Sequence, residues 1–105
     1  MYKLDFFEEV ESDLLALPQD VFEEANNYFK KYMEDPLKYS QKLFNKDDLN
    51  LEGYRKTYIA NATYRIVIKV EDNITKIVEV VAVGKREDKE IYKEAYKRIS
   101  INKSK

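Results

Sequence analysis

The spacing of the apolar residues changes twice along this chain of 105 residues, and the two changes restrict the folds open to it. Up to about Glu34 the apolar residues recur every three or four positions, the spacing of an amphipathic helix. From Tyr54 to Val83, β-branched and aromatic residues form runs typical of strands. Helical spacing returns after Asp88. This order of segments predicts an α+β fold.

The N-terminal part is predicted to form a strand followed by a helical hairpin. Residues 2–6 alternate modestly, as a short strand does. The apolar stripe of the first helix consists of Phe7, Val10, Leu14 and Leu17. Pro18 interrupts this helix, and a second runs over about 19–34 until Asp35-Pro36 ends it, because the residue before a proline disfavours helical angles. So short a connection predicts antiparallel helices.

The rest of the chain is predicted to be a loop, three strands and a helix. Residues 36–53 are polar and mixed, and are expected to be a loop with one short helical turn. Strands are predicted over 54–59, 64–70 and 74–83, with a hairpin turn at Asp72-Asn73. A final helix is expected over 88–101, with its buried stripe at Ile91, Ala95 and Ile99. The predicted order is β-α-α-β-β-β-α, one domain over 1–105, with the helices on one face of a mainly antiparallel sheet.

Composition limits the chemistry, because the chain holds no histidine and no cysteine. It can form no disulfide, and any catalysis would depend on lysine, arginine, tyrosine and carboxylates. A metal site would need carboxylates alone, and these fall on the predicted outer faces of helices, so we expect no metal and no cofactor. No apolar run is long enough to cross a bilayer or to serve as a signal core. We therefore expect a cytoplasmic protein without membrane contact.

Charge is unevenly distributed although the net value is only −1. Residues 1–50 hold 6 Lys/Arg against 12 Asp/Glu, a net of −6, and residues 51–105 hold 13 against 8, a net of +5. A basic second half would give the folded protein one face able to meet RNA. The alternative is that charge simply fluctuates along a short chain.

Basic residues of the predicted strands are candidates for binding phosphate. Lys56 and Tyr58 share one face of their strand, because side chains alternate. Arg65 on the next strand, Arg86 at the end of the last strand and Tyr92 on the last helix can converge on that open face. Guanidinium forks match phosphate oxygens well. The same charges also fit ordinary solvated strand residues, and the spacing alone does not decide between the two.

Three segments of the second half resemble the RelE branch of the RelE/ParE superfamily of bacterial toxins. They are Tyr64-Arg65 before an aliphatic strand, Val83-Gly84-Lys85-Arg86-Glu87, and Ile91-Tyr92 followed by Ala95 and Lys97-Arg98-Ile99. The resemblance is strong over 53–101 and weaker over 1–52. It implies a RelE-like domain that is the toxin of a type II toxin–antitoxin pair. Its expected activity is ribosome-dependent cleavage of mRNA in the ribosomal A site.

The resemblance also implies roles for individual residues. In the family, the 2′-hydroxyl of the RNA attacks the adjacent phosphate, and lysine and arginine side chains neutralise the developing charge. Lys56 matches a family lysine, and Arg65 matches the arginine that stabilises the transition state. Arg86 matches the arginine proposed as general acid, and Tyr92 the tyrosine that orients the bases. These four are the expected catalytic residues, and no metal or cofactor is implied.

Two positions depart from the family pattern. Tyr58 stands where the family has a second lysine, and Ala60 where it has another basic residue in the same strand. A tyrosine donates a hydrogen bond or stacks on a base, but carries no positive charge at neutral pH. We expect Tyr58 and Lys85 to contact RNA, with the departures affecting the catalytic rate rather than the fold.

The implied partners are a cognate antitoxin, the ribosome with its mRNA and, through the antitoxin, operator DNA. Two alternatives stay open. The first is a ParE-type toxin that inhibits DNA gyrase, which needs no catalytic arginine cluster. The second is a catalytically weak member of the family that acts mainly by binding its antitoxin and regulating transcription.

Overall fold

The computed structural model describes residues 1–43, 51–85 and 90–103. The elements are β1 (Lys3–Phe6), α1 (Val10–Leu15), α2 (Gln19–Glu34), β2 (Gln41–Lys42), β3 (Tyr54–Ile59), β4 (Tyr64–Asp72), β5 (Lys76–Lys85) and α3 (Glu90–Lys103). The predicted α+β class is confirmed. So are the limits of α2 and β3, while β4, β5 and α3 each extend two residues beyond their predicted ends. Within the predicted loop of 36–53, residues 36–39 form a turn and a two-residue strand that was not predicted, β2, follows; residues 44–50 lie outside the described part.

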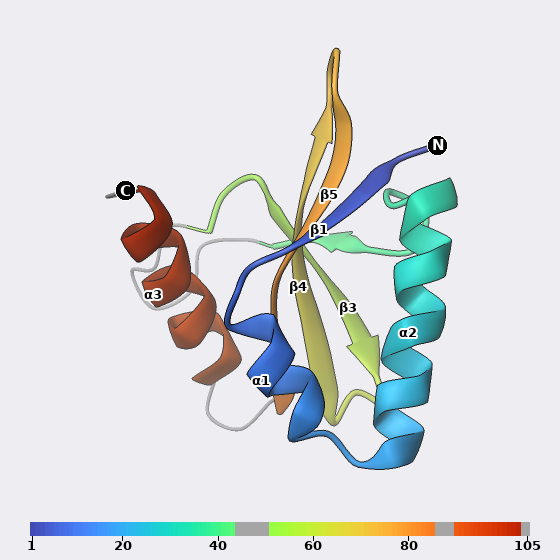
Figure 1. Cartoon of the computed structure of the whole chain (residues 1–105), viewed down its shortest axis with the longest axis vertical. Helices are drawn as coiled ribbons and strands as arrows, with labels where there is room; N and C mark the ends of the chain where they lie inside the picture. The colour runs from blue at the N-terminus through green and yellow to red at the C-terminus, as the bar shows by residue number, and fades with distance from the viewer. Residues whose placement is uncertain (44–50, 86–89, 104–105) are drawn as a thin grey trace.

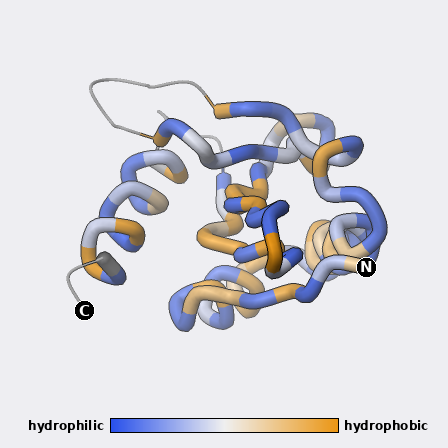
Figure 2. The backbone as a smooth tube through the Cα atoms, turned by 90° about the horizontal axis from the view of Figure 1, so that it is seen from above, coloured by the Kyte–Doolittle hydropathy of each residue, from blue (hydrophilic) through white to orange (hydrophobic). Residues whose placement is uncertain are grey.

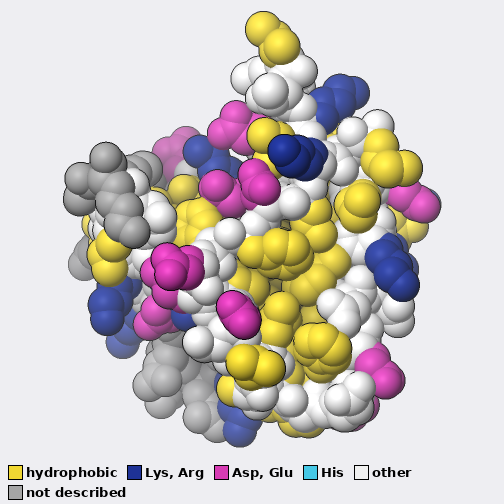
Figure 3. All heavy atoms as spheres, in the orientation of Figure 1, with side chains coloured by type: hydrophobic (Ala, Val, Ile, Leu, Met, Phe, Trp, Pro, Cys, Tyr) yellow, Lys and Arg dark blue, Asp and Glu magenta, His cyan; other side chains and the backbone are white. Residues whose placement is uncertain are grey.

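The sheet has five strands in the order β1-β5-β4-β3-β2 (Figure 1). Neighbours pair antiparallel except β1, which pairs parallel with β5 from Lys3↔Ile77 to Phe6↔Val80. The sheet is therefore mainly antiparallel, as predicted. Because β1 covers only the first half of β5, no described strand lies beside the second half of β5 on that side. The hairpin between β4 and β5 protrudes from the body, with Ile74 fully exposed at its tip (Figure 3).

The helices lie on both faces of the sheet, which corrects the prediction that they share one face. Figure 1 shows α2 on one side of the strands and α3 on the other. One cluster of buried side chains joins α1 and α2 to the sheet through Val10, Phe29 and Ile66. A second joins α3 to the opposite face through Ile91 and Val67. Apolar stretches accordingly mark the strands in the middle of the molecule (Figure 2). Alternation puts apolar side chains on both sides of β4, so both faces need a cover.

A β-bulge on β5 shifts the sheet register by one residue. Val67 on β4 pairs with Ala82, but Ile68 pairs with Val80, so Val81 is the extra residue. Both Val81 and Ala82 are fully buried in the cluster under α3. The bulge reverses which β5 side chains face which helix, because side chains alternate with a period of two.

The turn between β3 and β4 is strained. Ala60, Asn61 and Ala62 all have positive φ, between 52° and 67°, in the left-handed region that non-glycine residues rarely adopt. Hydrogen bonds hold the turn: the amide of Thr63 donates to the Ala60 carbonyl, and the amide of Ala60 donates to the Glu24 carboxylate. Ala60 therefore lies in the turn that directly follows β3.

Candidate functional site

β3 and β4 bring Lys56, Tyr58 and Arg65 together, as strand alternation predicted. Tyr58 stands directly opposite Arg65 in the antiparallel register. The Arg65 Cζ lies 4.5 Å from the centre of the Tyr58 ring, and the Lys56 Nζ lies 4.9 Å from the same ring. Both distances suit attraction between a cation and an aromatic ring. The Tyr58 ring thus contacts both cations, Lys56 on its own strand and Arg65 on the neighbouring strand.

α3 adds Tyr92 to this group. The Arg65 Nη1 donates a hydrogen bond to the Tyr92 hydroxyl, and the Arg65 Cζ lies 5.0 Å from the centre of the Tyr92 ring. The guanidinium is therefore in contact with two tyrosines from different elements. We call the four side chains Lys56, Tyr58, Arg65 and Tyr92 the arginine cluster. Sequence reasoning predicted that these residues would meet.

Burial separates this arrangement from the open cationic face expected from the sequence. Arg65 is only 6% exposed and Tyr92 only 1% exposed, whereas Lys56 and Tyr58 are half-buried. Among the described residues, the Arg65 Nε finds no hydrogen-bond partner, and none of the ion pairs includes this arginine. A buried guanidinium held by aromatic rings and one hydroxyl retains unused capacity to bind an anion.

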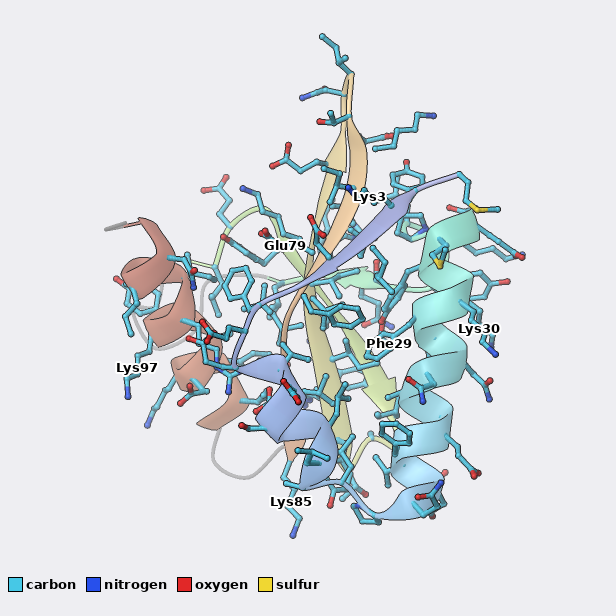
Figure 4. All side chains as sticks on the ribbon, in the orientation of Figure 1. Lys3, Phe29, Lys30, Glu79, Lys85 and Lys97 are labelled. Atoms are coloured by element: carbon cyan, nitrogen blue, oxygen red, sulfur yellow. The ribbon has the colours of Figure 1, made fainter. Side chains whose placement is uncertain are left out.

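The two remaining predicted residues stand apart from the cluster. Lys85 pairs with Tyr64 across the strands, so its side chain projects from the opposite face of the sheet to Arg65. It is exposed at the lower end of β5 in Figure 4. Arg86 lies outside the described residues.

Gly84 shapes the cluster from β5, where it pairs directly with Arg65. A Cβ placed on Gly84 would lie 3.1 Å from the Cδ1 of Ile91, closer than such atoms normally pack. The absence of a side chain at Gly84 thus lets the first turn of α3 approach the sheet, and Tyr92 follows Ile91 in that turn.

An ion pair that sequence reasoning missed ties α3 to α1. The Arg98 Nη1 and Nη2 donate to the two carboxylate oxygens of Asp13 at 2.6 and 2.8 Å, and Arg98 Nε donates to Glu94 at 2.9 Å. Asp13 also accepts the amide of Val83, and Arg98 donates to the Val81 carbonyl. The hydrogen bonds that Arg98 donates to the Asp13 carboxylate raise the pKa of Arg98. The only signal in the sequence was that Arg98 directly precedes Ile99, which was predicted to be buried.

The described residues provide no group of three or more carboxylates that could hold a metal ion. No helix among them has the length and apolar character needed to cross a membrane.

Comparison with known proteins identifies the family. The chain is 34% identical over 98 residues to the mRNA interferase toxin RelE of Escherichia coli, covering 93% of this chain and 97% of that protein. The mRNA interferase RelE of Shigella flexneri matches to the same extent. This chain belongs to the RelE family. No general family model matches the sequence.

Solved RelE structures share the fold. A double arginine-to-alanine mutant of E. coli RelE in the free state superposes with a TM-score of 0.70 at 31% identity, covering 93% of this chain and 97% of that one. RelE in the intact E. coli RelBE toxin–antitoxin complex gives 0.66 at 27% identity, with 83% and 99% covered. The predicted RelE resemblance is confirmed over nearly the whole chain, including the N-terminal part where the sequence signal was weaker.

Proposed function

We propose that this chain is the toxin of a type II toxin–antitoxin system and an endoribonuclease that cuts mRNA in the ribosomal A site. The observation that supports this most is the arginine cluster, four side chains from three elements in a RelE-family fold. The relatives of this chain carry the name mRNA interferase. The cluster contains cationic side chains, which can neutralise charge on a phosphorane without a metal ion.

The proposed chemistry is attack by the 2′-hydroxyl of the RNA on the adjacent phosphate. This attack forms a 2′,3′-cyclic phosphate and releases a 5′-hydroxyl. Arg65 would neutralise the additional negative charge on the phosphorane, and Lys56 would support it from the neighbouring strand. Tyr92 would orient the bases, and Arg86 would protonate the leaving oxygen.

Arg65 must exchange its partner before it can act. In the structure its Nη1 donates to the Tyr92 hydroxyl and the side chain is buried. A phosphate oxygen is a stronger acceptor than a neutral hydroxyl, because charge-assisted hydrogen bonds are about twice as strong as neutral ones. We infer that the scissile phosphate takes the place of the Tyr92 hydroxyl on Arg65. Since the arginine has no carboxylate partner among the described residues, no ion pair there has to break.

The proposed protein partner is a cognate antitoxin, since E. coli RelE has been solved in complex with the antitoxin RelB. The ribosome with its mRNA and, through the antitoxin, operator DNA are the other proposed partners. A catalytically weak toxin is the second candidate, and two observations favour it. They are the burial of Arg65 and the tyrosine at position 58 in place of a lysine.

Primer extension on mRNA in a purified translation system tests the proposal, with and without ribosomes. Loss of one donor to a developing oxyanion slows catalysis by about 10²–10³-fold, so Arg65→Ala should reduce cleavage to that extent. Lys56→Ala should also slow it. Lys30→Ala is the matched control, since Lys30 points into solvent from α2 (Figure 4). Parental cleavage by Arg65→Ala would disprove the assigned site, and no cleavage by the parent would favour the weak toxin.

A further inference from the structure

A small hollow adjoins the arginine cluster at the edge of β3. It has a volume of about 240 Å³, and its lining includes Tyr28 of α2, Tyr39 from the segment after α2, and Lys56 and Tyr58 of β3. β2 pairs with β3 only at Arg55 and Lys56, so the hollow lies where the short edge strand stops. Two of the lining residues, Lys56 and Tyr58, also belong to the arginine cluster.

Lysines lie over the tyrosine rings around this hollow. The Lys31 Nζ is 4.7 Å from the centre of the Tyr28 ring and 5.3 Å from that of Tyr39, and the Lys38 Nζ is 5.4 Å from the Tyr39 ring. Lys56 and Tyr58 repeat this pairing at 4.9 Å. We call these six residues the tyrosine–lysine platform.

Within the described residues, the three lysines of the platform form no ion pair with a carboxylate. The Asp35 carboxylate, which precedes the segment that holds Lys38 and Tyr39, accepts a hydrogen bond from the backbone amide of Lys38. Proteins hold single-stranded nucleic acid with aromatic rings interleaved with cations, because bases stack on the rings and phosphates meet the cations.

We propose that the tyrosine–lysine platform is a stacking subsite for the RNA nucleotide next to the scissile phosphate. The inference rests on the proposed function, since Arg65 marks the place of that phosphate. The Tyr58 ring contacts Arg65 and also lines the hollow, so a nucleotide bound at Arg65 has its neighbour within reach of Tyr28 and Tyr39. Pockets for drug-sized ligands measure roughly 300–1,000 Å³, so the smaller hollow suits a single planar base.

Stacking of this kind tolerates any base, because every base offers a flat face. The subsite would therefore increase affinity for the RNA chain without selecting a codon. An acidic antitoxin segment is the rival occupant. RNA fits better, because the platform combines its charges with three stacking surfaces and continues into the arginine cluster.

Binding of a fluorescent hexanucleotide with 2′-O-methyl sugars, which block cleavage, tests the subsite by anisotropy. Tyr39→Leu should weaken binding about tenfold, the usual effect of losing one stacked ring. Tyr39→Phe keeps the ring and should bind like the parent. Because Tyr39 packs partly against the core, thermal melts must accompany these variants.

A pair of lysine variants gives a second comparison that leaves the core untouched. Lys31→Gln should lower the slope of log affinity against log salt by about one unit. Lys30→Gln removes the same charge from the adjacent residue, which points from α2 into solvent and belongs to neither the platform nor the hollow, and should leave the slope unchanged (Figure 4). Equal effects of the two lysine variants, or parental binding by Tyr39→Leu, would overturn the subsite. So would a parent that fails to bind the oligonucleotide at low salt.

Two further outcomes separate this inference from the proposed function. If Tyr39→Leu weakens binding of the antitoxin and leaves RNA binding unchanged, the platform is a protein contact and the subsite is wrong. If the platform variants weaken RNA binding but the parent cuts no mRNA on ribosomes, the subsite is supported and the proposed nuclease activity is disproved.

Discussion

Replacing Asp13 by alanine should destabilise this protein more than any loss of a surface charge. β1 leaves the second half of β5 without a neighbouring strand, and the Asp13–Arg98 pair occupies that edge. Asp13 accepts the Val83 amide at 3.0 Å and two guanidinium hydrogens of Arg98. The two side chains are only 15% and 8% exposed. The substitution would leave a buried guanidinium and a backbone amide short of acceptors.

The magnitude follows from that burial. Removing one partner of a buried ion pair costs about 3–5 kcal/mol, out of roughly 5–15 kcal/mol for a whole domain. At about 4–8 °C per kcal/mol, Asp13→Ala should lower the melting temperature by at least about 12 °C. Glu94→Ala is the matched control, because Glu94 contacts the same arginine but is 44% exposed. An exposed pair contributes about 1 kcal/mol or less, so this variant should shift the melting temperature by a few degrees.

Urea unfolding followed by circular dichroism measures both variants, and a third completes the cycle. Arg98→Met removes the buried charge, so the double variant Asp13→Ala/Arg98→Met should lose less than the sum of its single variants. High salt should change the cost of Asp13→Ala little, because buried pairs are weakly screened. If Asp13→Ala costs no more than Glu94→Ala, or if the double variant is simply additive, the pair does not hold the edge of β5.

Three other predictions concern single side chains. Tyr58→Lys should speed mRNA cleavage in the translation assay, because it adds a positive charge beside Arg65; a variant that only loses stability would make Tyr58 a packing residue. Tyr92→Phe should lower the free energy of unfolding by about 1–3 kcal/mol, because the buried Nη1 of Arg65 loses its acceptor, and an unchanged urea midpoint would contradict this. Burial raises the pKa of Glu79 above 4.5, so the folded state favours its neutral form. The loss of stability from ionising Glu79 is therefore absent at low pH and appears as the pH rises past the unfolded pKa. Glu79→Gln, which cannot ionise, should raise the melting temperature at pH 7 and not at pH 3.

Prolines, turn residues and the spacing of apolar residues were enough to predict α2 and β3. Proline at position 18 and Asp35-Pro36 bracket α2, and its apolar spacing is regular, so its limits were predicted correctly. β3 was equally clear, because the turn that follows it is short. The pairing of β2 could not be predicted, since two polar residues carry no strand pattern and depend on β3 for every hydrogen bond.

The prediction that all helices lie on one face of the sheet was wrong for a different reason. Residues 66–68 read as a continuous aliphatic run, and such a run in a sheet signals burial on both faces. The helical hairpin covers only one of those faces, so α3 had to cover the other. The pair Asp13–Arg98 was beyond sequence reasoning, because its members are 85 positions apart and each looked like an ordinary charge on a helix surface.

The sequence predicted which residues form the candidate site, but not how deeply they are buried. Alternation along β3 and β4 indicated that Lys56, Tyr58 and Arg65 share a face. It did not indicate that Tyr92 would bury the arginine, because the depth of a side chain depends on how closely a helix approaches the sheet. Nor did it reveal the platform, because only the fold places Tyr28 of α2 and Tyr39 around one hollow.

The approach of α3 traces back to the bulge at Val81. If the same sequence paired without the bulge, Arg65 would stand opposite Val83, and a branched side chain would lie where Gly84 now leaves room for Ile91. With it, Gly84 faces α3, the first turn of the helix closes on the sheet, and the Tyr92 hydroxyl reaches Arg65. The one-residue shift therefore determines both the burial of the arginine and its contact with the last helix. Whatever moves α3 away from the sheet must also release Arg65.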